Sequence, residues 1–202
     1  MPVARSSAPS GLRLTDSPAA YGLISKLLHW GMVGLFLWQM ASVLLRVFFW
    51  ESGGEAQAAA RALWRTHHQT GVLILALALL RGAWGLLNAR NRPPHEASFL
   101  GRAAWLGHLA LYALMILVPS LAVLRFHAMA RAPLNAFGFE ILPQAPAPDE
   151  ALRSVGDALH GPLGWTLFAL ICGHVFMVVL HQVLWKDATL SRMTGEGAPP
   201  AS

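Results

Sequence analysis

The last long apolar run of the chain, residues 159–185, carries three histidines: His160, His174 and His181. Fourteen residues separate the first two, and seven separate the second two. At about 3.6 residues per helical turn, these spacings bring all three imidazoles close to one face, with His160 about 21 Å from His174 along the axis. Ionisable side chains are costly inside a membrane. Three on one stripe therefore indicate a site that holds something at two depths.

Histidines in the other apolar runs match these two depths. His29 opens the first run, and His67 and His68 open the second. Because successive spans cross a membrane in opposite directions, His29 shares a level with His174, and His67 shares a level with His160. Each of these two pairs could hold a metal centre.

Glycines distinguish the two neighbouring histidines of the second run. Gly71 follows His67 by four residues, and Gly164 follows His160 by four. Each imidazole therefore has a bare patch one turn further along its own helix face, where a flat macrocycle could lie. His68 has no glycine at this offset and points about 100° away from His67. We rank His68 behind His67 as a ligand.

Paired neutral imidazoles from separate helices of an apolar bundle are typical of a b-type haem held on both faces. A zinc site needs more closely clustered ligands, and no Asp or Glu lies inside the apolar runs. The single cysteine, Cys172, excludes an internal disulfide and a thiolate-held iron–sulfur cluster. The alternative for any one histidine is a hydrogen-bonded structural role. We favour that role for His95 and His127, which lie in or near loops.

The elements that must position these histidines are membrane spans. Of the 202 residues, 55% are hydrophobic and only 12% are charged, and the mean hydropathy is +0.47. This composition predicts an all-α integral membrane protein, a four-helix transmembrane bundle in contact with the lipid bilayer. The predicted spans lie at about residues 24–49, 64–87, 103–124 and 162–185. They belong to one domain, residues 21–193, between a disordered N-terminal arm (1–20) and a disordered tail (194–202).

The basic residues flank the apolar runs and form no separate patch, so the pI near 10.3 predicts no nucleic-acid partner. They exceed the acidic residues on the side that holds both termini and balance them on the other side. By the positive-inside rule, both termini are expected in the cytoplasm. The pair His29 and His174 then lies at the inner level, and His67 and His160 lie at the outer level. The connection over residues 125–157 is rich in proline, which argues against a long regular helix there.

Several motifs resemble those of the prokaryotic cytochrome b561 family, and most of all its short members that oxidise superoxide. These motifs are His29 followed by Trp30, His-x-x-x-Gly from His67, His-Leu-x-x-Tyr from His108, Phe137 followed by Gly138, and the pair His174 and His181 followed by Trp-Lys-Asp-x-Thr-Leu-x-Arg-Met from Trp185. The resemblance covers about residues 20–193. It implies a multi-pass protein of the bacterial inner membrane with two b haems, one held by His29 with His174 and one by His67 with His160.

Two imidazoles leave the haem iron no open position, so electrons must enter and leave through the porphyrin edge. The resemblance implies an oxidoreductase that reduces ubiquinone at the inner end and oxidises superoxide at the outer end. Arg61 and Arg65 precede His67 and could attract the superoxide anion. Pairing with haem propionates, or with Glu51 and Glu55, would explain these arginines equally well.

At the inner end, His108, His181 and Lys186 could hydrogen-bond haem propionates or a quinone carbonyl, and a histidine could pass the proton that quinone reduction requires. The alternative function is that of a haem-b subunit that carries electrons between a partner dehydrogenase or hydrogenase and the quinone pool. The outer loop is modest and offers no large docking element, which favours the stand-alone oxidoreductase. A haem-free structural bundle, the third alternative, would show no Soret absorption.

Overall fold

The computed structural model describes residues 13–93, 98–187 and 189–195 of the chain. Its long helices are α1 (Leu23–Phe49), α2 (Gly54–Leu87), α3 (Phe99–Ala128) and α4 (Glu150–Leu180), the last continued by a π-helical turn, η2 (His181–Trp185). The short elements are η1 (Ala89–Asn91), β1 (Leu134–Ala136), β2 (Phe139–Leu142) and α5 (Ser191–Thr194). Within these described residues, four helices are long and apolar enough to cross a membrane, which confirms the predicted fold class.

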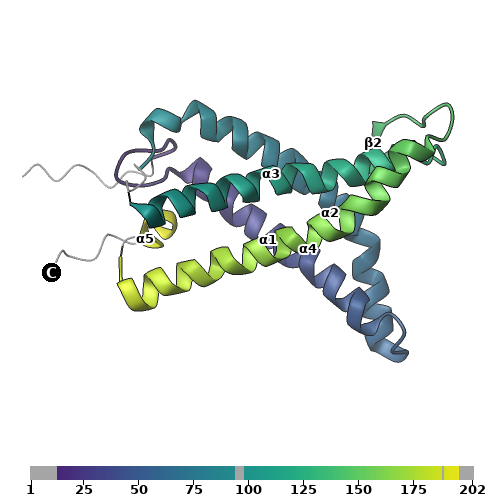
Figure 1. The fold of residues 1–202 in the computed structure, drawn as a ribbon, viewed down its shortest axis with the longest axis horizontal. Coiled ribbons are helices and arrows are strands. Elements are labelled where there is room, and N and C mark those ends of the chain that lie inside the picture. The colour runs from purple at the N-terminus through teal and green to yellow at the C-terminus, as the bar shows by residue number, and fades with distance from the viewer. Residues whose placement is uncertain (1–12, 94–97, 188, 196–202) are drawn as a thin grey trace, which may run out of the picture.

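The bundle consists of two helical hairpins (Figure 1). Helix α1 packs along α2, and α3 packs along α4; α2 joins the hairpins by contacting α3. In the described residues, α1 and α4 have no comparable packing against each other. At one end of the bundle, the turn between α1 and α2 diverges from the small β1–β2 hairpin, as the right-hand side of Figure 1 shows. The interior between α1, α2 and α4 is therefore less closed by backbone packing than the two hairpins are.

The core lies in the middle of the bundle and draws on all four long helices. Its buried members are Met32 and Phe36 of α1, Ile74 and Ala78 of α2, Met115 and Val118 of α3, and Leu167 of α4. Many other large apolar side chains point outward, as lipid-facing residues do. Helix α4 is packed most loosely, since only 6% of its most apolar window is buried, against 22–28% for the other three. This loose packing leaves much of α4 free to face lipid or a cofactor.

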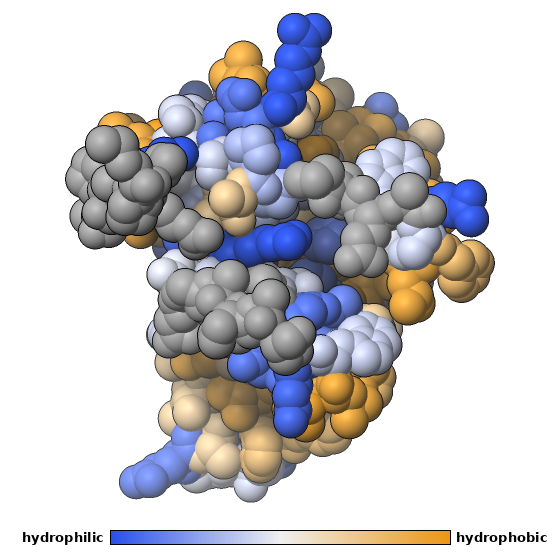
Figure 2. All heavy atoms as spheres, turned by 90° about the vertical axis from the view of Figure 1, so that its left-hand side faces the viewer, coloured by the Kyte–Doolittle hydropathy of each residue, from blue (hydrophilic) through white to orange (hydrophobic). Residues whose placement is uncertain are grey.

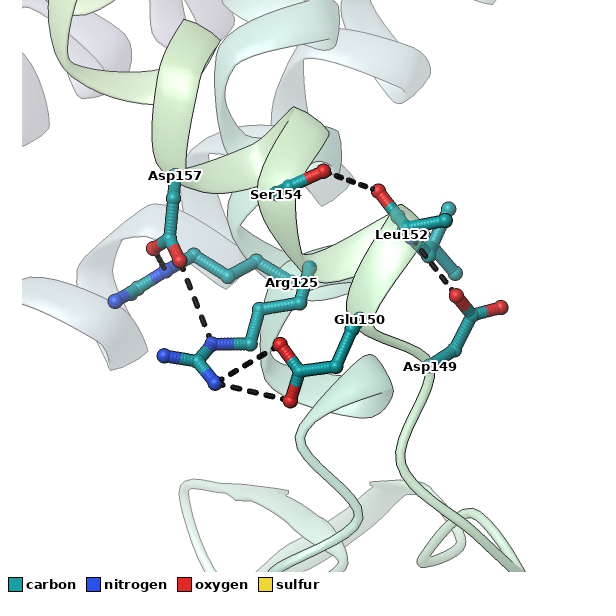
Figure 3. A network of polar contacts seen from close by, with 8 residues as sticks. Arg125, Asp149, Glu150, Leu152, Ser154 and Asp157 are labelled. Atoms are coloured by element: carbon teal, nitrogen blue, oxygen red, sulfur yellow. Dashed lines mark hydrogen bonds and ion pairs between the residues drawn. The ribbon is translucent and has the colours of Figure 1, made fainter.

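Helix α4 begins at Glu150, well before the start that the sequence predicted near residue 162. Asp149 caps the helix, because its side chain accepts a hydrogen bond from the Leu152 backbone N–H at 2.9 Å (Figure 3). Arg153 pairs with Glu150 one turn away and with Asp157, which also binds Arg125 of α3. These polar turns extend the helix beyond the apolar run and carry it through Pro162. Helix α2 also begins earlier than the sequence predicted, at Gly54. Its N-cap residue, Gly53, and Gly54 itself both have positive φ, which glycine adopts readily.

Helices α3 and α4 approach each other closely at Gly156. A Cβ atom added to Gly156 would lie 2.5 Å from Cβ of Arg125 and 3.0 Å from the carbonyl oxygen of Leu121. Only glycine fits such a contact without moving one helix. The connection between α3 and α4 contains the antiparallel β1–β2 hairpin and irregular segments. Its described residues form no long helix, as the prolines of this segment predicted.

Residues 13–20 are held against the bundle, which corrects the expectation that they belong to a disordered arm. Asp16 is 6% exposed and accepts hydrogen bonds from the Gly22 backbone N–H at 2.9 Å and from Arg92 Nε at 3.2 Å. Close to this contact, the Tyr21 backbone N–H donates to the carbonyl oxygen of Arg192 at 3.4 Å. This hydrogen bond brings the segment after α4 beside the start of α1. Hydrophilic side chains gather over this end of the bundle, and hydrophobic ones surround it (Figure 2). Residues 1–12, 94–97 (including His95), 188 and 196–202 lie outside the described part of the chain.

Candidate functional site

Both histidine pairs that the sequence predicted lie close together in space. The ring centres of His29 and His174 are 6.5 Å apart and join α1 to α4. Those of His67 and His160 are 6.4 Å apart and join α2 to α4. One helix therefore contributes an imidazole at each level, and the two helices of the other hairpin contribute the partners.

These separations can be compared with what a shared metal requires. A metal–imidazole bond is about 2.0–2.1 Å long and the ring centre lies about 1.1 Å behind the nitrogen, so two imidazoles on opposite sides of one metal have centres about 6.3 Å apart. Both observed distances match this value within about 0.2 Å. In addition, no cluster of three or more metal-binding side chains occurs among the described residues. The donor sets are thus pairs, as an axially ligated macrocycle needs.

The outer pair has hydrogen-bonded partners that suit metal ligands. His160 Nδ1 lies 2.9 Å from the Val118 carbonyl oxygen of α3, which can only accept, so Nδ1 carries the proton. His67 Nδ1 lies 2.9 Å from Oγ of Ser42 in α1. A ring nitrogen held in this way fixes the orientation of a ligand histidine and leaves its Nε2 for the metal.

A cavity of about 580 Å³ adjoins the outer pair, within the range of about 300–1,000 Å³ of small-molecule sites. All four long helices line it, and its walls include His67, His160, Gly71 and Gly164. A Cβ atom added at Gly164 would have only one neighbour, Cγ1 of Val118 at 4.0 Å, so the space beside this residue is open. The bare patches that the sequence predicted beside both imidazoles are therefore part of one cavity.

Gln39 of α1 is a buried polar residue in the wall of this cavity. It is 8% exposed, and its Nε2 donates to the carbonyl oxygen of His67 at 3.1 Å and lies 3.3 Å from His67 Nε2. Its Oε1 atom is buried without a hydrogen-bond partner in the described structure. An unpaired buried oxygen is costly and calls for an explanation. It is the kind of defect expected where a bound group is missing from the pocket, so these residues fit a haem at the outer level.

The inner pair is arranged differently. Arg81 of α2 lies with its Nη2 atom 3.0 Å from His29 Nδ1 and with its guanidinium 5.3 Å from the ring centre of Tyr112. A guanidinium can only donate, so His29 Nδ1 accepts, and the neutral ring carries its proton on Nε2. Ligation through Nε2 requires this contact to change. His108 of α3 also reaches this level, with its ring centre 5.2 Å from that of His174.

The remaining histidines of the outer end, His68 and His127, make other contacts, although His68 also lines the outer cavity. His68 turns toward β1, with its Nε2 3.2 Å from the Asn135 carbonyl oxygen, and it stacks parallel to Phe126. His127 lies in the last turn of α3. The structure thus brings His67, and not His68, opposite His160.

Aromatic and basic side chains surround the outer cavity. The His67 ring stacks on Trp64 with ring centres 4.5 Å apart, and the Arg46 guanidinium lies 4.0 Å from the ring centre of the same tryptophan. Arg46 and Arg65 both line the cavity, whereas Arg61 lies over Trp50 on the outer side of α2. In the described residues, no ion pair joins Arg61 or Arg65 to an acidic side chain.

At the opposite end, His181 forms a short contact with an acidic residue. Its Nδ1 lies 2.5 Å from Oδ2 of Asp187, and the Thr189 backbone N–H donates to Oδ1 at 2.9 Å. Burial alone would raise the pKa of Asp187, but the hydrogen bonds from Thr189 and His181 outweigh it, so the pKa lies below its ordinary value. Lys186, which lies between His181 and Asp187 in the sequence, adopts a left-handed conformation (φ 50°) that ends η2, and its side chain is exposed.

Sequence reasoning missed the polar partners of the histidines, namely Ser42, Gln39, Arg81 and Asp187. A signal was present for the first three, because each is a polar or ionisable residue inside a predicted span. The partnership of Asp187 with His181 depends on the π-helical turn, which the apolar pattern does not encode.

Comparison with known proteins identifies the family of the chain. Cytochrome b561 homolog 2 of Escherichia coli (strain K12) is 29% identical over 195 residues, which cover 93% of this chain and 97% of that protein. The family model for prokaryotic cytochrome b561 matches residues 20–196, a range that contains all four long helices and both histidine pairs. The chain therefore belongs to the prokaryotic cytochrome b561 family, multi-pass inner-membrane proteins that transfer electrons through haem b.

Proposed function

We propose that the chain carries electrons across the membrane through two b haems, one between His29 and His174 and the other between His67 and His160. The proposal is carried by the ring-centre distances of 6.5 Å and 6.4 Å at two levels of α4. Both termini lie on the cytoplasmic side, as the excess of basic residues there indicates. The first pair is then near the cytoplasm, and the second is near the periplasm.

A haem held by either histidine pair would supply a one-electron couple, and reactants would exchange electrons with it without binding the metal. The chain's own residues decide what reaches that edge. Gly71 and Gly164 line the outer cavity, with open space beside Gly164, and core residues such as Phe36 and Leu167 make part of its wall apolar.

Superoxide is the proposed electron donor at the outer end. Arg46 and Arg65 line the outer cavity and give it positive charge without a carboxylate partner in the described ion pairs. Such a charge raises the rate at which a small anion arrives. Each superoxide gives up one electron and leaves as dioxygen. Arg61, which points to Trp50, contributes only to the wider field around this site.

Ubiquinone is the proposed acceptor at the inner end. Reduction of one quinone to the quinol takes two electrons, from two superoxide ions, and two protons. His181 is suited to deliver a proton, because the Asp187 carboxylate holds its Nδ1 and leaves Nε2 toward a reactant. His108, beside His174, and Lys186, at the end of α4, are the other groups proposed to contact a quinone carbonyl or a haem propionate.

Haem content tests the ligand assignment. We expect His160→Ala and His174→Ala each to lose about half of the haem of the purified protein, because each removes one ligand of one pair. His68→Ala is the matched control, since this neighbour of His67 faces Asn135, and it should keep the full haem content. Full haem in both α4 variants, or loss in the control, would refute the pairing.

A second experiment tests the donor and the acceptor. Purified protein exposed to a flux of superoxide should show rapid haem reduction, and added ubiquinone should then reoxidise it. Superoxide dismutase in the same mixture is the control and should abolish the reduction. A subunit that only receives electrons from a partner protein would respond slowly with or without the dismutase, and that result would contradict the proposed donor.

A further inference from the structure

We propose that Ser42 is a positioning residue that fixes the tautomer of His67 and so prepares His67 to bind iron through Nε2. The inference rests on the proposed function in one respect, namely that His67 is a haem ligand. Ser42 is fully buried in α1, with 0% of its surface exposed, and it contacts His67 across the α1–α2 interface. It is a polar residue in the middle of an apolar span, and packing alone does not explain it.

The position of one proton follows from two distances. Ser42 Oγ lies 2.6 Å from the carbonyl oxygen of Gln39 and 2.9 Å from His67 Nδ1. A hydroxyl has one proton to donate, and a carbonyl oxygen has none. The serine proton must therefore point to the Gln39 carbonyl, because two bare oxygen atoms would repel each other at this distance. Ser42 Oγ is left as an acceptor for His67, so Nδ1 of His67 carries the ring proton.

The neutral His67 ring then has its lone pair on Nε2, the nitrogen that must bind the metal. The side chain of Gln39 supports this tautomer independently. Its Nε2 faces the His67 carbonyl oxygen, which only accepts, so the amide nitrogen is correctly placed and can also donate to His67 Nε2 at 3.3 Å. Both ligands of the outer pair thus have a protonated Nδ1, His160 through the Val118 carbonyl and His67 through Ser42.

An acceptor on Nδ1 also changes the electron donation of a ligand imidazole. It makes the ring more basic, which favours ferric over ferrous iron and lowers the reduction potential. Removing the Ser42 hydroxyl should therefore make the outer haem easier to reduce. The acceptor for His160 is a backbone oxygen and cannot be removed by substitution, so Ser42 is the accessible test of this pair.

The experiment compares three variants of the complete haem-loaded protein by redox titration. In Ser42→Ala, we expect the equilibrium of one haem to move about threefold or more toward the reduced form, which is about 28 mV at 59 mV per tenfold change. The other haem should not change. Ser42→Thr keeps the hydroxyl and should stay near the original potential. Ser120→Ala is the matched control, since the Ser120 hydroxyl also donates to a carbonyl within a span, that of Ile116, and contacts no histidine in the described hydrogen bonds.

The comparison remains decisive if Ser42→Ala cannot hold the outer haem. Retention of that haem in Ser42→Thr and its loss in Ser42→Ala would support the hydroxyl, because the larger threonine disturbs a fully buried position at least as much as alanine does. Equal behaviour of the two variants, whether both keep the original potential or both lose the haem, would overturn the role of Ser42. His67→Ala separates the two proposals: if it keeps both haems, the ligand assignment fails and not merely the hydrogen bond to Ser42.

Discussion

The close contact at Gly156 predicts that a single methyl group will disturb the outer site from a distance. In Gly156→Ala, the new Cβ would meet Cβ of Arg125 at 2.5 Å and the Leu121 carbonyl oxygen at 3.0 Å. Ordinary contacts of this kind exceed about 3.4 Å, so α4 must move away from α3 by several tenths of an ångström. Such overpacking costs about 1–3 kcal/mol, and the better helix propensity of alanine returns about 0.5–1 kcal/mol. The net destabilisation should be about 1 kcal/mol, between limits of about 0 and 2.5 kcal/mol.

The displacement should reach the proposed outer haem site, because His160 lies one helical turn beyond Gly156 on α4. The hydrogen bond from His160 Nδ1 to the Val118 oxygen, 2.9 Å long, joins the same two helices. A separation of several tenths of an ångström would stretch it past the usual limit of about 3.2 Å. For a net cost of about 1 kcal/mol, we expect the thermal midpoint in detergent to fall by about 2–4 °C, with a shift in the spectrum of one haem only.

Gly173→Ala is the control for this effect. Gly173 lies in the same helix, and an added Cβ atom would meet nothing within 4 Å in the described structure. This variant should be at least as stable as the original protein, since alanine is the better helix former. If Gly156→Ala matched the control in both the thermal midpoint and the haem spectra, the close α3–α4 contact would not be what holds the outer site.

Four further predictions concern the polar groups around the two ends. Arg65→Glu should slow haem reduction by superoxide about threefold to tenfold at low salt, and the difference should vanish near 1 M salt, where the Debye length is about 3 Å; equal rates at low salt would exclude steering by Arg65. Asp187→Asn should slow quinone reduction about tenfold and leave the haem content unchanged, because His181 loses its charged acceptor. Since the pKa of Asp187 lies below its ordinary value, its carboxylate contact should persist from neutral pH down to about pH 4 and be lost only in stronger acid, which a titration of quinone binding can follow. Gln39→Leu should speed haem uptake by the outer site, because it removes the amide that competes for Nε2 of His67; slower uptake measured by Soret absorbance would show that the amide assists binding.

Histidine spacing predicted which imidazoles approach each other because helix geometry is local and fixed. The rise per residue determines the depth of His160 and His174 from their sequence numbers alone, and the topology of the spans then places His29 and His67. The start of α4 was harder to predict. The prolines before it argue against a helix. Two features of the sequence favour one: a capping residue, Asp149, and charged residues spaced for pairing along the first turns of α4.

Tertiary partnerships could not be predicted in the same way. Whether Ser42 meets His67 depends on how far α1 rotates against α2, and a rotation of one residue, about 100°, would separate them. The contact between Asp16 and Arg92 joins positions far apart in the chain and orders residues 13–20, although their composition resembles that of a flexible arm. Composition reports how much apolar surface a segment can bury, but not whether one buried carboxylate finds a partner.

The two histidine pairs also account for how α4 is held. Helix α4 packs closely on α3 around Gly156, but little of its apolar window is buried, and in the described residues it has no extensive contact with α1. The pair His29 and His174 therefore spans an interface that side-chain packing alone leaves weak. A group that binds only the assembled bundle stabilises the bundle, and a tighter-binding group stabilises it more. Under the proposed ligation, the same bonds that align the electron path would dock α4 against the first hairpin, so that assembly of the bundle and formation of the path would be one event.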